Sequence, residues 1–222
     1  MGKQKSILSA HQQELFSLFS KESSLCKKFY LGGGTALSEF YLQHRLSEDL
    51  DFFSEEEVDT EPLFVFLRSV QKRLGIKMID FEQSFNRNLF FLKYADGDVL
   101  KAEWTWYPFP RIESGKTVGK LAVDSLLDIA VNKVFTMYQK PRARDFIDLY
   151  FIVREGGFTL SSLVKKAQVK FDWHVDPIQL GAQFLQAEVV KDYPRMIQNI
   201  ESAEWQNFFI VEAKKLQKNI FE

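Results

Sequence analysis

Apolar residues recur at two different periods along this chain, and each period predicts a different kind of element. The spacing of three and four residues that is typical of an amphipathic helix covers residues 9–21, 35–44, 60–74, 124–138, 140–154, 160–171, 176–190 and 202–219. Strand-like composition and alternation mark residues 28–31, 49–53, 76–85, 88–94 and 98–107. The predicted strands therefore all lie in the first half of the chain, and helices make up the second half.

A break in both periods suggests where the chain divides. Residues 108–122 are polar and turn-rich, and Pro108 and Pro110 open them. Proline favours turns and edges over the interior of regular elements. We therefore expect a first domain over residues 1–115 and a helical second domain over residues 116–222.

Several candidate functional residues lie close together in residues 30–53. Gly32–Gly34 form a turn, and a helical pattern starts at Thr35. Asp49 and Asp51 are two residues apart on a predicted strand, so they share one face. Two like charges this close need a counter-charge, and Mg²⁺ prefers carboxylates together with substrate phosphates. A glycine turn before a helix offers backbone N–H groups to phosphates. The combination suits transfer of a nucleotidyl group; the alternative is a tight turn whose acids flank a hairpin.

This stretch resembles the first motif of the AbiEii/AbiGii toxin family of nucleotidyltransferases. The matching segments are GGGTAL and HRLSEDLDFF, and the resemblance extends over nearly the whole chain. It implies an α+β fold: a nucleotidyltransferase core with a small mixed sheet flanked by helices, followed by a C-terminal helical half. It also implies a Mg²⁺–NTP complex bound between the halves, with phosphates held by Gly33, Gly34 and Thr35. The departure is an extra glycine in the turn.

The resemblance assigns a third carboxylate to a strand next to the acid pair. Within residues 98–107, Glu103 lies on the face opposite the apolar side chains. By resemblance it is the candidate third metal ligand beside Asp49 and Asp51, or the group that activates the attacking hydroxyl. The alternative is a surface glutamate paired with Lys101.

Two further signatures lie in the predicted helices over 124–154. Lys133 stands close to an apolar stripe, where a lysine ordinarily extends to solvent; the resemblance implies that it reaches the bound triphosphate. Asp145 and Asp148 are three residues apart and so are neighbours on a helix. The resemblance places them in the active-site wall, as catalytic groups or as groups that orient Lys133. The alternative is a buried ion-pair network.

Two clusters of basic residues have open roles. Arg45 and His44 close the predicted helix 35–44, where cations favour the helix dipole. Arg45 is therefore either a helix-end cation or a phosphate-binding or fold-stabilising group near the acids. The run KKAQVK at 165–170 is either a solvated helix face or an RNA contact.

Composition limits the class of protein and the cellular compartment that we expect. Of 222 residues, 45% are hydrophobic and 22 are phenylalanine, enough for a sizeable core. The net charge of −1 gives no general attraction to nucleic acid. A single cysteine, Cys26, excludes a disulfide framework and fits a reducing compartment. Scattered histidines give no zinc pattern, no apolar run approaches a membrane span, and the N-terminus lacks a signal-peptide core. We expect a cytoplasmic protein without membrane contact.

The resulting hypothesis is a Mg²⁺-dependent nucleotidyltransferase, with Mn²⁺ as a substitute metal, that transfers NMP from an NTP to an acceptor hydroxyl. The resemblance implies the toxin of a toxin–antitoxin or abortive-infection system. It also favours the tRNA 3′ end, or another RNA, as acceptor, and a cognate antitoxin as partner. Two alternatives stay open. One is a non-catalytic nucleotide- or partner-binding module of the same fold. The other is a nucleotidyltransferase acting on a protein or a small molecule.

Overall fold

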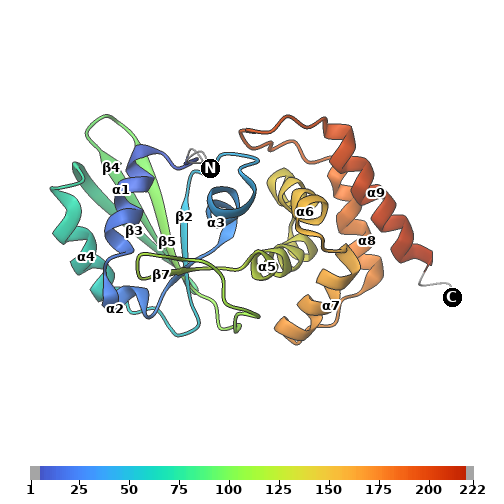
Figure 1. The fold of residues 1–222 in the computed structure, drawn as a ribbon, viewed down its shortest axis with the longest axis horizontal. Helices are drawn as coiled ribbons and strands as arrows, with labels where there is room; N and C mark the ends of the chain where they lie inside the picture. Colours follow the sequence, from blue (N-terminus) through green and yellow to red (C-terminus); the bar gives the residue numbers. More distant parts are fainter. Residues whose placement is uncertain (1–5, 219–222) are drawn as a thin grey trace. The chain divides into compact units, whose positions relative to one another are not determined.

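A mixed β-sheet organises the first part of the chain in the computed structural model, which describes residues 6–218 (Figure 1). Within those residues the sheet has seven strands, in the order β3-β4-β5-β2-β1-β7-β6. Their bounds are β1 (Tyr30–Leu31), β2 (Leu50–Ser54), β3 (Ile76–Ser84), β4 (Arg87–Tyr94), β5 (Val99–Trp106), β6 (Thr117–Val118) and β7 (Leu121–Val123). The β2–β5 and β1–β7 pairs are parallel and the other pairs are antiparallel. The α+β fold with a mixed sheet and flanking helices is confirmed.

Helices account for most of the remaining described residues. Those early in the chain are α1 (Ala10–Phe19), α2 (Ser23–Cys26), α3 (Gly33–Leu37), the π-helix η1 (Ser38–Leu42) and α4 (Glu61–Gln71). The later ones are α5 (Leu126–Gln139), α6 (Ala143–Gly156), α7 (Leu160–Phe171), α8 (Pro177–Leu185), the 3₁₀ turn η2 (Gln186–Glu188) and α9 (Ser202–Lys218). None of the helices in the described part of the chain has the length and apolar character needed to cross a membrane.

The chain divides into two compact units. Of the described residues, those up to Phe40 and those in Ser47–Ser125 form the first unit, and Tyr41–Leu46 joins the residues from Leu126 onward in the second. We expected the division after residue 115. Residues 117–123 instead carry β6 and β7, which pair with the sheet, so the first unit runs to Ser125.

One face of the sheet carries the core of the first unit. The ring of Phe19 on α1 lies 4.4 Å from that of Phe52 on β2 and 5.7 Å from that of Trp104 on β5. Phe66 on α4 meets Phe19 at 5.4 Å. These four side chains are buried, so α1 and α4 cover this face. A capping box begins α1, because Ser9 and Gln12 exchange side-chain and backbone hydrogen bonds.

The predicted helix over 35–44 is wrong at both ends. The helix starts earlier, at Gly33, and after one α-helical segment it widens into η1, which ends at Leu42. The residues that follow bond to a distant part of the second unit: the carbonyl oxygen of His44 accepts from the N–H of Ile197 at 2.8 Å. Tertiary hydrogen bonds therefore end this helix before its side-chain pattern does.

The second unit has its own core of aromatic and aliphatic side chains. Phe146 on α6 lies 5.9 Å from Trp205 and 4.9 Å from Phe209, both on α9. Phe184 on α8 meets Phe209 at 5.5 Å. All four are almost completely buried, which makes this cluster the centre of the helical packing.

Candidate functional site

The glycine turn lies directly against the strand that carries the acids. Gly33 has φ +67°, a conformation that favours glycine. A Cβ atom at this position would lie 2.8 Å from Oδ2 of Asp51. The N–H of Gly32 donates to the carbonyl oxygen of Asp51 at 3.0 Å. The backbone of the turn and the Asp51 carboxylate therefore share one small space, and a side chain at Gly33 would displace the carboxylate.

The loop that leads into Asp49 is held by two buried side chains. The Thr35 hydroxyl donates to the carbonyl oxygen of Asp49 and lies 2.8 Å from Oγ of Ser47. Gln12 donates to the carbonyl oxygen of Ser47 at 2.9 Å. Because Thr35 is fully buried and its hydroxyl is used in this way, the predicted phosphate contact of Thr35 would have to come from its backbone N–H.

The acids lie on the sheet face opposite the core. Leu50 and Phe52 are fully buried on the α1 side, while Asp51 is partly exposed. Asp51 is directly opposite Glu103 in the parallel β2–β5 pair. Asp49 precedes β2, and its carboxylate binds the Lys101 ammonium at 2.7 Å, both side chains being about a quarter exposed. The alternation predicted from the sequence thus brings Asp51 and Glu103 to one face.

Glu103 is engaged by an arginine that the sequence did not single out. Nε and Nη2 of Arg87 lie 2.6 and 2.7 Å from its two carboxylate oxygens, the two-pronged geometry that makes such pairs strong. The Thr105 hydroxyl adds a third bond at 2.8 Å, whereas the predicted partner Lys101 is 3.7 Å away. Burial alone would raise the Glu103 pKa, but the hydrogen bonds from Arg87 and Thr105 outweigh it and hold the pKa below its usual value.

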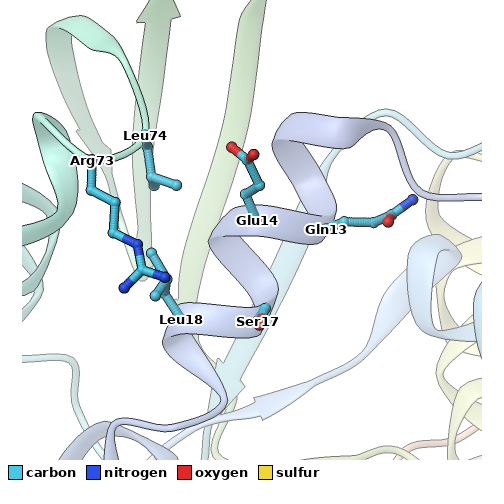
Figure 2. A pocket seen from close by; sticks show the side chains of 6 residues that line it. All are labelled: Gln13, Glu14, Ser17, Leu18, Arg73 and Leu74. Atoms are coloured by element: carbon cyan, nitrogen blue, oxygen red, sulfur yellow. The ribbon is translucent and has the colours of Figure 1, made fainter.

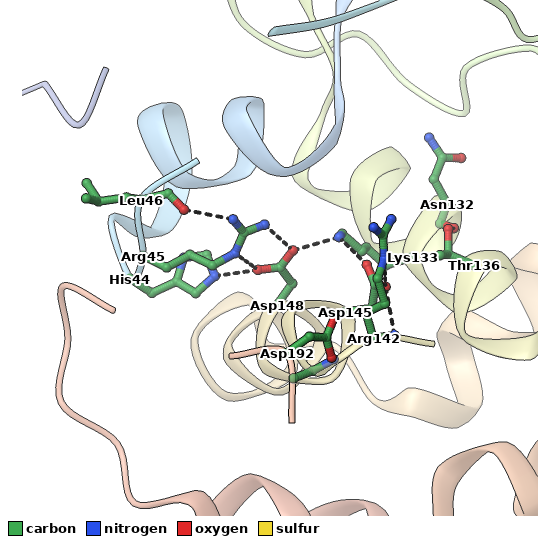
Figure 3. A network of polar contacts seen from close by, with 11 residues as sticks. His44, Arg45, Leu46, Asn132, Lys133, Thr136, Arg142, Asp145, Asp148 and Asp192 are labelled. Atoms are coloured by element: carbon green, nitrogen blue, oxygen red, sulfur yellow. Dashed lines mark hydrogen bonds and ion pairs between the residues drawn. The ribbon is translucent and has the colours of Figure 1, made fainter. Parts of the chain in front are cut away.

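The signature residues of the second unit form a buried network of charges (Figure 3). Asp148 accepts from Nε and Nη2 of Arg45 at 2.6 and 2.8 Å, and from Nε2 of His44 at 2.8 Å. The Lys133 ammonium lies 2.7 Å from Asp148 and 2.8 Å from Asp145. This arrangement gives Arg45 a fold-stabilising contact. It is not a helix-end cation, because the preceding helix ends at Leu42.

The charges in this network stabilise one another. Burial would raise the pKa of Asp148, but Lys133 and Arg45 outweigh it and hold the pKa well below its usual value. Burial would lower the pKa of Lys133, and the two aspartates raise it instead. Asp148 is completely buried and Lys133 nearly so. The network alternative raised from the sequence is therefore present in the structure, and it leaves a catalytic role for Lys133 open.

Two sets of acidic side chains are candidates for holding a divalent metal, the predicted pair and a second group. Asp49 and Asp51 supply the hard carboxylate oxygens that Mg²⁺ prefers, beside a turn that a Cβ would fill, so the donor set fits the metal. The sequence did not predict the second group. Nε2 of His11 lies 3.0 Å from Asp96 and 3.7 Å from Asp98, and one ligand atom from each falls within 4.8 Å of the others. His11 precedes these aspartates by a long stretch of chain, so no local spacing could have revealed the group.

None of the predicted site residues lines the small open pocket shown in Figure 2. Side chains of α1 and of the segment after α4 line it: Gln13, Glu14, Ser17, Leu18, Arg73 and Leu74. None of them takes part in the contacts described above. We assign it no role.

Comparison with known proteins identifies the family of this chain. A family model described as "Nucleotidyl transferase AbiEii toxin, Type IV TA system" matches residues 17–211. The uncharacterized protein aq_aa25 of Aquifex aeolicus is 32% identical over 149 residues, which cover 66% of this chain and 68% of that protein.

Solved structures show the same fold. A proposed nucleotidyltransferase from H. pylori superposes with a TM-score of 0.62 at 21% identity, covering 96% of this chain and 97% of that one. The Mycobacterium tuberculosis nucleotidyltransferase toxin MenT4 gives 0.60 at 16% identity, covering 92% and 82%. The fold is therefore the one found in these solved structures, and the family model gives the class, a nucleotidyltransferase. The chain belongs to the AbiEii family of nucleotidyltransferase toxins, which confirms the resemblance drawn from its motifs.

Proposed function

We propose that this nucleotidyltransferase uses Mg²⁺, or Mn²⁺ in its place, to transfer NMP from an NTP to a hydroxyl group, with the 3′ end of tRNA as the favoured acceptor. The observation that supports this most is the contact between Gly33 and the Asp51 carboxylate. It brings a turn suited to phosphates against an acid suited to a metal. A bound metal would neutralise phosphate charge at Asp49 and Asp51.

The backbone of the turn has the donors that a phosphate needs. The first N–H groups of a helix have no acceptor within the helix, and here they belong to Gly33, Gly34 and Thr35. N–H groups at the N-terminus of a helix point out of the helix and favour the binding of anions. We propose that they bind the phosphate chain of the NTP. Of the predicted metal ligands, Glu103 has the least support, because Arg87 binds both of its oxygens.

Lys133 is the proposed triphosphate contact in the second unit. Its ammonium is fixed between Asp145 and Asp148, and an ammonium is a point charge suited to phosphate oxygens. We propose that the two aspartates position Lys133 rather than touch the substrate. Arg45 then holds Asp148 in place and has no direct contact with the nucleotide.

The biological setting follows from the family. A toxin of this family is expected to have a cognate antitoxin, and we propose such a partner here, together with a cytoplasmic location. The rival hypotheses, a binding module without catalysis and a transferase with a protein or small-molecule acceptor, predict different outcomes in the test below.

The deciding experiment is transfer of label from each α-labelled NTP to total tRNA in the presence of Mg²⁺. We expect label on tRNA from the wild type and a loss of roughly a hundredfold or more in Asp51→Asn, since metal stabilisation of developing charge is worth several kcal/mol. The matched control is Asp80→Asn, which removes a carboxylate from β3 that forms an ion pair with Lys93 at 2.5 Å.

Each outcome is informative. Unchanged transfer in Asp51→Asn would show that the site assignment is wrong. NTP-dependent protection against thermal unfolding without labelled tRNA would indicate another acceptor. NTP binding without any product from total RNA, protein or small-molecule extracts would support the binding module.

A further inference from the structure

The tip of the β3–β4 hairpin exposes a large aromatic ring to solvent. Ser84 pairs with Arg87, which leaves Phe85 and Asn86 as a two-residue loop. Phe85 is 99% exposed, the highest value among the exposed large hydrophobic residues of the described chain. An aromatic ring that covers no core makes no contribution to the stability of this hairpin.

The backbone of Phe85 is also unsuited to its side chain. Its φ is +51°, in the left-handed region that bulky residues rarely occupy. A two-residue hairpin with positive φ at the first loop position favours glycine there. Residues kept in such conformations are concentrated at functional sites, so the combination of exposure and strain points to a role for this ring.

The loop is firmly anchored to the neighbouring strand. The carbonyl oxygen of Asn86 accepts from the N–H of Trp106 at 2.9 Å, and the Asn86 side chain donates to the Trp106 carbonyl oxygen at 2.6 Å. Phe85 is therefore presented on a rigid support, which lowers the entropic cost of binding a ligand.

The next residue of the hairpin links this tip to the acid face. Arg87 reaches Glu103, which lies directly opposite Asp51. Its side chain is half exposed, and Glu103 engages only Nε and Nη2. A guanidinium has five N–H donors, so Arg87 retains donors for an anion while Glu103 fixes its direction.

We propose that the β3–β4 hairpin binds one nucleotide of a single-stranded polynucleotide acceptor, with the base stacked on Phe85 and a phosphate bound by Arg87. The inference rests on the proposed function and narrows the acceptor to nucleic acid. Stacking suits any base because every base has a π face, and a fixed guanidinium suits phosphate oxygens. In this scheme Glu103 acts as the anchor of Arg87 and is a positioning residue.

The test measures binding separately from transfer. The full chain, without NTP, is titrated against a short fluorescein-labelled single-stranded RNA with a free 3′ hydroxyl, and anisotropy gives the Kd. We expect Phe85→Ala to raise the Kd about 5- to 140-fold, the range that loss of one base–aromatic stack produces. Phe85→Trp should restore binding.

Phe85→Gly separates binding from folding. Glycine suits this backbone, so we expect an unchanged or higher Tm together with the same loss of RNA affinity. Val99→Ala is the control, since Val99 is an exposed apolar residue at the start of β5. Wild-type affinity in both Phe85→Ala and Phe85→Gly, or no RNA binding by the wild type, would overturn the proposal.

Arg87→Gln tests the phosphate contact. We expect a higher Kd and a salt dependence of log Kd that is shallower by about 0.7, as for one lost phosphate on a single strand. Lys93→Gln, which removes an exposed cation from the same strand, should leave that slope unchanged. Loss of NTP-dependent thermal protection in Arg87→Gln with unchanged RNA affinity would assign Arg87 to the NTP and overturn the proposal.

The two proposals fail in different ways. Phe85-dependent RNA binding without label transfer from any NTP would leave this inference standing and remove the proposed function. Label transfer to RNA that is unaffected in Phe85→Ala and Arg87→Gln would do the reverse.

Discussion

This protein has two clusters in which aspartate pairs with lysine. One cluster is partly exposed to solvent and the other is buried. On the acid face of the first unit, the Asp49 and Lys101 side chains are 28% and 24% exposed. In the second unit, the side chains of Asp148 and Lys133 are 0% and 11% exposed. Exposed pairs are weak and exchange partners readily, whereas a buried charge that loses its partner is costly. The first cluster can therefore rearrange at little cost, as the proposed metal site requires, whereas the second holds a lysine in one place.

The strongest test of this contrast is to remove the centre of the buried cluster. Asp148→Asn deprives Arg45, Lys133 and His44 of their shared carboxylate, so we expect a loss of about 3–5 kcal/mol in the free energy of unfolding. Asp49→Asn removes the carboxylate of the exposed pair and should cost less than about 1 kcal/mol. Urea denaturation of both variants at pH 7 provides the measurement, and equal losses would remove the distinction between the clusters.

The pH dependence of stability sharpens the same contrast. Because the pKa of Asp148 is lower in the folded state than the usual value of about 3.9 in an unfolded chain, this residue stabilises the fold fully above that value. Its contribution is lost as the pH falls below about 4 towards the folded-state pKa. Urea curves of wild type and Asp148→Asn should therefore differ by a constant amount above pH 5 and converge in stronger acid. A difference that stays constant into strong acid would contradict the depressed pKa.

Substitution at the glycine turn should reduce the free energy of unfolding less than Asp148→Asn does, and it should also reduce activity. Gly33 and Gly75 have nearly the same positive φ, +67° and +70°, but only a Cβ at Gly33 would meet Asp51. Alanine at either position should cost about 1–2 kcal/mol through backbone strain. Only Gly33→Ala should lower the rate of label transfer, by about tenfold or more, because it displaces a carboxylate of the site. Equal activities would show that the turn and the acid act independently.

The smallest effect is expected on the exposed face of α7. Lys165 and Lys166 are exposed, whereas Lys170 binds the buried Asp128 at 2.7 Å. Lys165→Ala should change the unfolding free energy by less than about 0.5 kcal/mol, and Lys170→Ala should cost several times more. Anisotropy with the labelled RNA used above tests the alternative role. A weakened Kd in Lys165→Ala would favour the RNA contact that the sequence left open.

Much of the fold could be inferred because its signals are local. The helical periods and the alternation around Glu103 each lie within a few residues. The helix after the glycine turn was placed less accurately. Its side-chain pattern runs to His44, but the backbone of that residue bonds to Ile197, a partner that no local pattern contains.

The candidate site also contains features that the sequence predicted and features that it did not. The acid pair and the turn were inferred because both lie in one short stretch, where helix length and strand alternation set which groups meet. Arg87 was missed because it reaches Glu103 from the neighbouring strand, 16 residues away in the chain. The His11 group was missed because His11 is far from Asp96 and Asp98 in the chain.

What the sequence by itself determined was the type of fold and the family, because periodicity and motif spacing are properties of short segments. Only the tertiary structure decided the partner of each charge: Arg87 for Glu103, Lys101 for Asp49, and Asp148 for Arg45, His44 and Lys133. Partners depend on strand register and helix packing, which bring together side chains that the chain itself keeps apart. Burial then sets how strongly each pair is held, and so which acids remain open to a substrate.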